Sequence, residues 1–295
     1  MGVMEDAPRV PAQRGRRGPI QRMASMVYHA AVPRRPSLEA LCVQARLPYR
    51  LIYSSNDPGL LEWVEALEPD LIVVHSMSRL LGKELFSLPR YGSINLHAAY
   101  LPEYRGPNPC LWQYVDMERR PGVTVHYIDE GEDTGDIIFQ ERVEIPVGIK
   151  SPARLDKLVG AVGVRLLLKA VKGIEDGTAP RIRQPARSPT SRARNLRPDE
   201  HATLIDWALW PGLRVWNVLC GTESWLNALP PPPGWCSGSR WIIGKFEANA
   251  CAGHVPGVIY KEGGRHFVAT KDGRIHLATR FSLIALANKV LSSWK

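Results

Sequence analysis

Apolar residues recur with two different spacings along residues 37–177. Apolar runs of strand length lie at 49–54, 70–76, 91–97, 122–128 and 136–145. Segments with helical spacing lie between or after them, at 37–47, 58–69, 79–88, 108–119 and 151–177. Because strands that alternate with helices build βα units, we predict an open, mainly parallel α/β sheet for this part of the chain.

Two local signals refine this prediction. Ser37 precedes the first helical segment and fits the N-cap position. The run "DLIVVHS" at 70–76 is almost continuously apolar, which is typical of a strand covered on both faces. In open α/β sheets, ligands bind beyond the carboxyl ends of the strands, so the residues that follow each strand are the first candidates for a site.

The pattern changes after residue 182. Residues 183–202 are rich in Arg, Pro and Ser and predict a linker. Residues 203–280 begin with a short helical segment and continue with short strands, two of them joined by the tight-hairpin signal "KDGR", so we predict a small β-barrel-like domain. Residues 281–295 predict a terminal helix. Residues 1–36 show neither spacing and predict a basic tail or loop.

Composition limits the class of protein. The chain has 295 residues, of which 44% are hydrophobic, so it can bury a sizeable core. Its five cysteines form no CxxC pair and no even framework, which indicates a reducing compartment. No apolar run approaches a transmembrane length, and the N-terminus lacks a secretory pattern. We therefore expect a cytoplasmic protein, with an organelle transit peptide as the alternative for the Arg-rich start.

The net charge of +9 is concentrated in two segments. Residues 1–50 hold nine Arg and three acidic residues (+6), and residues 181–200 hold six Arg and two acidic residues (+4), which leaves −1 for the rest. Such segments suit a phosphate-rich partner, for example tRNA or a nucleotide. A solvated tail and a solvated linker explain the same charges equally well.

Three places hold polar side chains that a purely structural role would not require. They are Asn95 and His97 at the end of one strand, His126 within another, and the carboxylate-rich turn "EGEDTGD" at 130–136. Each has a simpler explanation, since Asn95 and His97 could order a loop, His126 could be a satisfied core histidine, and Asp133 could close an Asx turn. No HxH or HExxH spacing occurs, so no metal site is predicted.

Together, however, these groups suit one kind of chemistry. An amide donor beside an imidazole can stabilise an oxyanion, and a nearby carboxylate can orient the imidazole or help to relay a proton. No GxSxG setting supports a covalent acyl-enzyme, and no GxGxxG or GxxxxGK[ST] motif supports nicotinamide or ATP chemistry. The reaction types that remain as predictions are direct acyl transfer and hydrolysis, each through a tetrahedral intermediate.

The segments "INLHAAYLPEYRGPNP" and "GVTVHYIDEGEDTGDII" are similar to the signature of the formyltetrahydrofolate-dependent formyltransferases. That family includes methionyl-tRNA formyltransferase, sugar-nucleotide N-formyltransferases and glycinamide ribonucleotide formyltransferase. The resemblance runs from about Ser37 to Gly177. It implies a Rossmann-like catalytic domain at 37–182. "IDWALWPGLRVWNVLCG" and "DGRIHLA" also resemble the OB-like C-terminal domain of some members, which implies such a domain at 203–280.

The resemblance also implies a role for individual residues. Asn95 and His97 would be the oxyanion and proton-transfer pair, and Asp133 the carboxylate that holds His97 and the catalytic water. The co-substrate N10-formyltetrahydrofolate would bind at Ser76, Met77, Ser78, Arg79, Leu80, Asp129, Glu130, Gly131 and Glu132. The formyl acceptor would bind at Arg105, Gly106, Asn108 and Trp112.

The resemblance leaves the acceptor open. "GPNPCLW" is closer to the sugar-nucleotide enzymes, and Trp112 could stack on a sugar or base, or instead pack in the core. The basic N-terminal segment, the Arg-rich linker and the OB-like domain would suit a tRNA. We favour an amino-sugar nucleotide as the small-molecule amine, with initiator methionyl-tRNA as the alternative.

The chain departs from the family at its start. The family begins with a strand, a Gly-containing turn and a helix, and "MGVMEDAPRVPAQRGRRGPIQ" shows no such strand. This departure leaves open a folate- or RNA-binding relative that has lost catalysis. A formyltetrahydrofolate hydrolase is a third alternative, but it would not need a second domain for an acceptor.

Overall fold

The computed structural model describes residues 1–6, 36–53, 57, 59–77, 79–234, 237–250 and 253–281. They form two compact units, and unit 1 contains 1–6, 36–146 and 152–195. Unit 2 contains 147–151 and the described residues from 196 onward. Most of the predicted N-terminal tail and nearly all of the predicted terminal helix at 281–295 lie outside the described residues.

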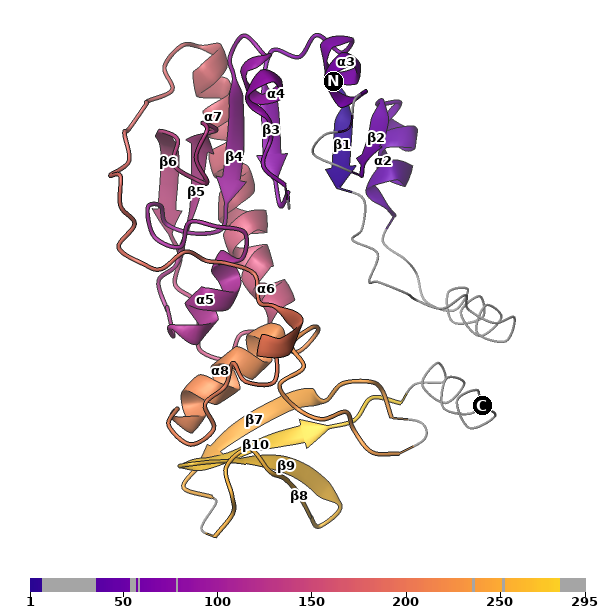
Figure 1. Ribbon diagram of the computed structural model, residues 1–295, viewed down its shortest axis with the longest axis vertical. Coiled ribbons are helices and arrows are strands. Elements are labelled where there is room, and N and C mark those ends of the chain that lie inside the picture. The colour runs from indigo at the N-terminus through magenta and orange to yellow at the C-terminus, as the bar shows by residue number, and fades with distance from the viewer. Residues whose placement is uncertain are drawn as a thin grey trace, which may run out of the picture. The chain divides into compact units, whose positions relative to one another are not determined.

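The centre of unit 1 is a four-stranded sheet with the order β3 (Ile72–His75), β4 (Ser93–His97), β5 (Gly122–Tyr127) and β6 (Ile137–Arg142) (Figure 1). β3 and β4 pair in parallel, as the βα pattern predicts, whereas β5 and β6 join antiparallel. The strands and helices follow the chain order that the apolar spacing predicts.

The N-terminal segment contains a strand that the sequence analysis did not predict. β1 (Val3–Asp6) pairs in parallel with β2 (Tyr49–Ile52), so the prediction of a missing first strand is wrong. The four residues "VMED" carry too few apolar side chains to show a strand period. The pairing instead depends on tertiary contacts, since Met4 packs against a buried cluster and Tyr49 Oη donates to Glu5 Oε2 at 2.6 Å.

The shorter helices of unit 1 are α2 (Leu38–Ala45), α3 (Leu60–Glu65), α4 (Lys83–Ser87) and α5 (Pro109–Val115). The predicted cap is confirmed, because the Ala40 amide donates to Ser37 Oγ at 3.1 Å. β3 differs from the prediction of a strand covered on both faces. Val73 and His75 alternate with the buried Ile72 and the half-buried Val74, so they share one face of β3, and both are exposed on it.

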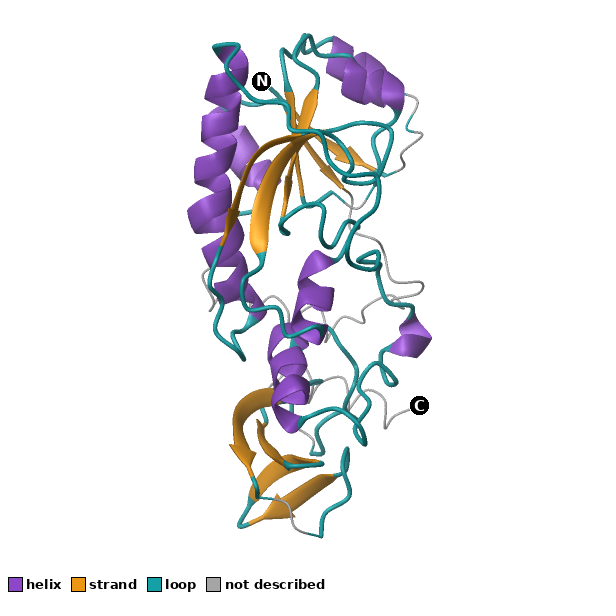
Figure 2. Cartoon of the chain, turned by 90° about the vertical axis from the view of Figure 1, so that its left-hand side faces the viewer, coloured by secondary structure: helices purple, strands orange, loops and turns teal. Residues whose placement is uncertain are grey.

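A long helical segment covers one face of the sheet (Figure 2). It consists of α6 (Ser151–Leu155), a π-helical stretch at Asp156–Gly163 and α7 (Val164–Glu175). Leu166, Ala170 and Ile174 recur four residues apart and pack on Ile94, Leu96, Val123, Val125, Tyr127 and Ile138 of the sheet. This contact is the main core of unit 1.

Unit 2 contains α8 (Gly212–Thr222) and an antiparallel sheet with the order β7 (Ile242–Ala248), β10 (Gly273–Ala278), β9 (Arg265–Thr270) and β8 (Ile259–Glu262). The predicted hairpin is confirmed, since Lys271 and Asp272 alone separate β9 from β10. A single 3₁₀ turn, Pro198–Glu200, precedes α8. Among the described residues the strands form one four-stranded sheet, and barrel closure is not observed.

No helix in the described part of the chain has the length and apolar character needed to cross a membrane. In the same residues, no group of three or more His, Cys, Asp or Glu side chains is placed to hold a metal ion.

Replacing Leu166 by Ala should lower the free energy of unfolding of unit 1 by about 2–5 kcal/mol, because it opens a cavity between α7 and the sheet. Leu168→Ala is the matched control, since Leu168 is 65% exposed and Leu166 only 4%. Its effect should stay within about 0.5 kcal/mol. Urea unfolding, monitored by circular dichroism, measures the free energy of unfolding of both variants. Equal losses of this free energy in the two variants would contradict the packing of α7 on the sheet.

Candidate active site

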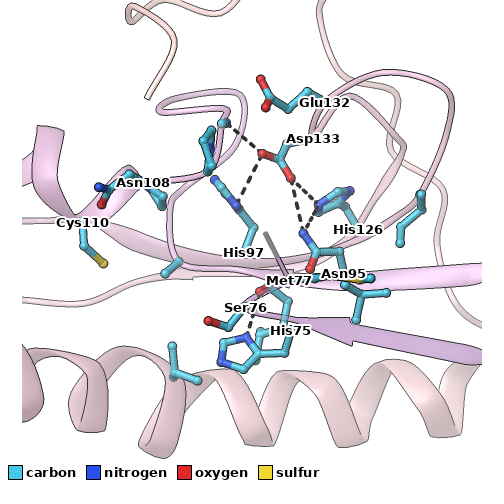
Figure 3. Close-up of a pocket in the computed structure, with 18 of the residues that line it drawn as sticks. His75, Ser76, Met77, Asn95, His97, Asn108, Cys110, His126, Glu132 and Asp133 are labelled. Atoms are coloured by element: carbon cyan, nitrogen blue, oxygen red, sulfur yellow. Dashed lines mark hydrogen bonds and ion pairs between the residues drawn. The ribbon is translucent and has the colours of Figure 1, made fainter. Parts of the chain in front are cut away.

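The pairing of β4 with β5 sets the position of the candidate catalytic side chains. Asn95 lies opposite His126, and His97 lies opposite Thr124. Because side chains alternate between the two faces of a strand, Asn95 and His97 point to one face while Ile94 and Leu96 enter the core. The turn after β5 then brings Asp133 above both strands (Figure 3).

Asp133 lies between two histidines (Figure 3). Its Oδ2 accepts a hydrogen bond from the Gly106 amide at 2.8 Å and lies 3.6 Å from His97 Nδ1. Its Oδ1 accepts from Asn95 Nδ2 at 3.3 Å and lies 3.5 Å from His126 Nε2. Four groups from three chain segments therefore surround one carboxylate.

The hydrogen bonds determine which nitrogen of each neutral imidazole carries the proton. His97 Nε2 must donate to the Tyr104 carbonyl oxygen at 3.0 Å, because a carbonyl can only accept. The lone pair of neutral His97 is then on Nδ1, facing Asp133. His126 Nδ1 donates to the Tyr127 carbonyl oxygen at 2.7 Å, so its Nε2 accepts from Asn95 Nδ2 at 3.2 Å.

Burial and charge act in opposite directions at this site. Burial lowers the pKa of His97 below its ordinary value, although the nearby Asp133 carboxylate opposes this shift. For Asp133, burial alone would raise the pKa. Interactions with His126 and His97 and the hydrogen bond from the Gly106 amide outweigh burial and lower the pKa of Asp133 to about 2. At neutral pH the site therefore holds an ionised carboxylate beside an uncharged His97.

The site opens into a pocket of about 730 Å³, a size that suits a small organic ligand. It brings together most residues predicted from sequence, namely Asn95, His97, Asp133, Ser76, Met77, Arg79, Leu80, Gly131, Glu132, Gly106 and Asn108. Ser78 lies outside the described residues. The predicted donor and acceptor segments thus meet at one cavity in unit 1.

Two residues predicted to bind the folate have other contacts. Asp129 Oδ1 accepts from the Gly131 amide at 3.0 Å and from Thr134 Oγ1 at 2.6 Å, so this side chain closes the turn. Glu130 forms an exposed ion pair with Lys83. Neither residue belongs to the pocket lining, because both side chains are used by the turn and its surface.

Two residues predicted to bind the acceptor also lie outside the pocket lining. Arg105 is buried, and its guanidinium donates to Gln184 Oε1 at 2.8 Å and to the Pro185 and Ala186 carbonyl oxygens at 2.9 and 3.3 Å. Trp112 Nε1 donates to the Arg194 carbonyl oxygen at 2.8 Å. Both side chains hold the chain segment after α7 in place.

The lining also contains His75, the last residue of β3, next to the predicted folate-binding residues that begin at Ser76. Other lining residues were not selected by sequence reasoning. Arg192 and Asn195 come from the predicted linker, where no local pattern indicated a pocket. Cys110 lines the pocket too, but burial raises the pKa of its thiol. Cys110 is therefore protonated at neutral pH and is not poised as a nucleophile.

Comparisons with known proteins identify the family. A family model described as formyl transferase matches residues 39–171. The methionyl-tRNA formyltransferase of Halothermothrix orenii is 37% identical over 231 residues, which cover 74% of this chain and 71% of that protein. The one from Anaeromyxobacter sp. is 33% identical over 251 residues, with 85% and 78% covered. This chain belongs to the formyltransferase family.

The match covers a smaller share of other proteins that are described as methionyl-tRNA formyltransferases. The match covers 65% of the Acidobacterium capsulatum protein and 46% of the Clostridioides difficile and Syntrophus aciditrophicus proteins. The chain thus spans between about half and two thirds of their length.

Solved structures share the fold. HypX from Aquifex aeolicus, in complex with tetrahydrofolic acid, has a TM-score of 0.59 and 17% identity, with 81% of this chain and 40% of that chain covered. An N-formyltransferase from Helicobacter canadensis, in complex with folinic acid and dTDP-3-aminofucose, has a TM-score of 0.56 and 18% identity, with 85% and 86% covered. The α/β fold predicted from the sequence is confirmed.

The lowered pKa of Asp133 should make the stability of unit 1 depend on acid pH. A shift from 3.8 to about 2 contributes roughly 2 kcal/mol to the free energy of unfolding at neutral pH. Because the folded pKa is depressed, this contribution is complete above about pH 5 and is lost as the pH falls towards 2.

Urea unfolding of the unaltered chain and of Asp133→Asn, between pH 6 and pH 2.5, measures this effect. The unaltered chain should lose more stability than the variant over that range, by about 1–2 kcal/mol. Parallel curves for the two proteins would contradict the assigned environment of Asp133.

Proposed function

We propose that this chain transfers a formyl group from N10-formyltetrahydrofolate to a primary amine. The observation that carries the proposal is the meeting of Asn95, His97 and Asp133 at one pocket in a chain of the formyltransferase family. An amide donor, an uncharged imidazole and an ionised carboxylate are the groups that a tetrahedral acyl transfer requires.

In the proposed reaction, a neutral amine attacks the formyl carbon of the donor. A new C–N bond forms, and the carbonyl electrons move to the oxygen, which becomes an oxyanion. Asn95 Nδ2 stabilises that charge when it turns from its long 3.3 Å contact with Asp133. Collapse of the intermediate then breaks the bond between the formyl carbon and N10.

Proton transfer in this reaction is assigned to His97. Its Nδ1 lone pair is free to accept the proton that the attacking amine loses, and the same nitrogen can return it to N10 of the leaving tetrahydrofolate. Asp133 stabilises the imidazolium that forms in between, because its carboxylate is already ionised and lies 3.6 Å away. Protons and bonds balance without a metal or a redox partner.

The folate is proposed to lie between the segment after β3 and the turn after β5. Met77 and Leu80 contribute apolar surface to the lining, and Gly131 and Glu132 border it on the other turn. This placement leaves the formyl carbon next to Asn95 and His97, and it leaves Gly106, Asn108 and Arg192 for the acceptor side.

For the acceptor, we propose the amino group of initiator methionyl-tRNA. Relatives described as methionyl-tRNA formyltransferases match up to 85% of the chain, so the similarity extends into unit 2. The sequence argument for an amino-sugar nucleotide was the likeness of "GPNPCLW" to the sugar-nucleotide enzymes, with stacking by Trp112 as a further point in its favour. That argument is weakened, because Trp112 is held outside the pocket lining by its bond to the Arg194 carbonyl.

One further alternative loses support, and a second is decided by an experiment. A relative without catalysis was considered because the first strand seemed to be missing, and β1 supplies that strand. A simple hydrolase would release formate without an acceptor. The difference between acceptor-dependent and acceptor-independent turnover distinguishes it from a transferase.

Asn95→Ala should lower kcat by about 10²–10³, because it removes the donor to the developing oxyanion. Tetrahydrofolate release from N10-formyltetrahydrofolate in the presence of acceptor measures the rate. Leu168→Ala, on the exposed face of α7, is the control and should keep full activity. A fully active Asn95→Ala protein would overturn the proposed role.

Parallel reactions with charged initiator methionyl-tRNA, a dTDP- or UDP-amino sugar, or no acceptor test the choice of substrate. We expect stimulation by methionyl-tRNA, abolished in His97→Ala. Stimulation by the amino sugar alone would replace the proposed acceptor. Equal turnover without any acceptor would indicate a hydrolase.

A further inference from the structure

The first part of the predicted linker is fixed to the candidate active site. Residues 184–195, here called the strap, follow α7, run past β6 and return towards the loop between β4 and α5 (Figure 1). The Ala193 amide donates to the Arg105 carbonyl oxygen at 2.7 Å, and the Asn108 amide donates to the Ala193 carbonyl oxygen at 2.8 Å. The strap is therefore part of unit 1.

Close backbone contact between strap and loop depends on Gly106. Its φ of +124° lies in the region that favours glycine, and a Cβ there would lie only 2.9 Å from the Ala193 carbonyl oxygen. The same residue donates its amide hydrogen to Asp133 Oδ2. The strap thus supports the segment that binds the side chain of Asp133.

Gln184 connects the strap to the backbone of Asp133. Its side chain is only 8% exposed, and Nε2 donates to the Asp133 carbonyl oxygen at 3.1 Å and to the Gly135 carbonyl oxygen at 2.7 Å. Its Oε1 accepts from Arg105 Nη2 at 2.8 Å. One amide therefore joins the strap, the loop after β4 and the turn that carries the carboxylate.

The turn needs such support because Asp133 has a φ of +54°. A non-glycine residue in this region is uncommon and strained, and it persists only where the surrounding structure holds it. Asp133 Oδ1 and Oδ2 must also keep their distances to Asn95 and His97, so a small rotation of this backbone would separate the reacting groups.

We propose that Gln184 is a positioning residue, whose amide fixes the backbone of Asp133 and thereby holds the carboxylate against His97. Arg105 acts one step further away by orienting the Gln184 amide. The catalytic part of this inference rests on the proposed formyl transfer, whereas the geometric part concerns only where Asp133 lies relative to His97.

The kinetic test uses two variants of nearly the same shape. Gln184→Glu keeps an acceptor for Arg105 but has no hydrogen to donate to the Asp133 and Gly135 carbonyl oxygens. Gln184→Met removes donor and acceptor without adding charge. Both should lower kcat about 10- to 100-fold, with KM for N10-formyltetrahydrofolate changed less than about twofold.

The matched control is Arg187→Gln, an exposed position of the same strap. It should leave kcat, KM and the melting temperature as they are in the unaltered chain. If both Gln184 variants keep their melting temperature and their kcat, the inference is overturned. If kcat falls only in proportion to the fraction unfolded, Gln184 is merely structural and the inference is also overturned.

A titration of His97 by NMR tests the geometry without any turnover. The ionisable groups that act on His97 are Asp133 and Glu132, which raise its pKa, and His126, which lowers it. In Gln184→Met the turn that carries both carboxylates should move away, so the pKa of His97 should fall further. An unchanged pKa of His97 in Gln184→Met would overturn the inference. If that pKa shifts but the unaltered chain transfers no formyl group, the result counts against the proposed function alone.

Discussion

The Asp133 carboxylate is the group on which the arrangement of the candidate site depends. A buried ionised carboxylate is costly unless hydrogen bonds and positive charge compensate for lost solvation. Here the Gly106 amide and the Asn95 amide donate hydrogen bonds to the carboxylate, and His97 and His126 lie 3.6 and 3.5 Å from it. Because these partners come from β4, β5 and the loop after β4, the need to satisfy one charge draws three segments together.

Neutral hydrogen bonds from neighbouring strands and helices also hold the surrounding loop. Thr124 Oγ1 donates to the Ala99 carbonyl oxygen at 2.7 Å, and Gln140 Nε2 donates to the Leu101 carbonyl oxygen at 2.9 Å. Gln113 Nε2 donates to the Ala98 carbonyl oxygen at 3.1 Å. These groups fix the backbone beyond β4.

Sequence patterns predicted the parts of the fold that are encoded locally. Helical spacing predicted the helical segment at 151–177 that contains α7, and "KDGR" located the hairpin between β9 and β10. The strand-end positions of Asn95 and His97 indicated the site. β1 was not predicted, because its four residues are ordered by pairing with β2 and this tertiary contact leaves no apolar period in the local sequence.

The roles of Arg105, Trp112 and Gln184 depend on contacts between residues that lie 49 to 82 positions apart in the chain. Arg105 binds the strap near Gln184, and Trp112 binds it at Arg194. A basic, Pro-rich segment predicts a linker when it is considered alone. Its place against the loop after β4 is a consequence of tertiary hydrogen bonding, so composition could not reveal it.

The register between β4 and β5 serves two purposes at once. Ile94 and Leu96 enter the core, while Asn95 and His97, in the alternate positions, face the pocket. A slip of one residue would send the polar pair into the core and the apolar pair into the pocket. Mispaired sheets are therefore both unstable and inactive, and selection for either property in this segment preserves the other.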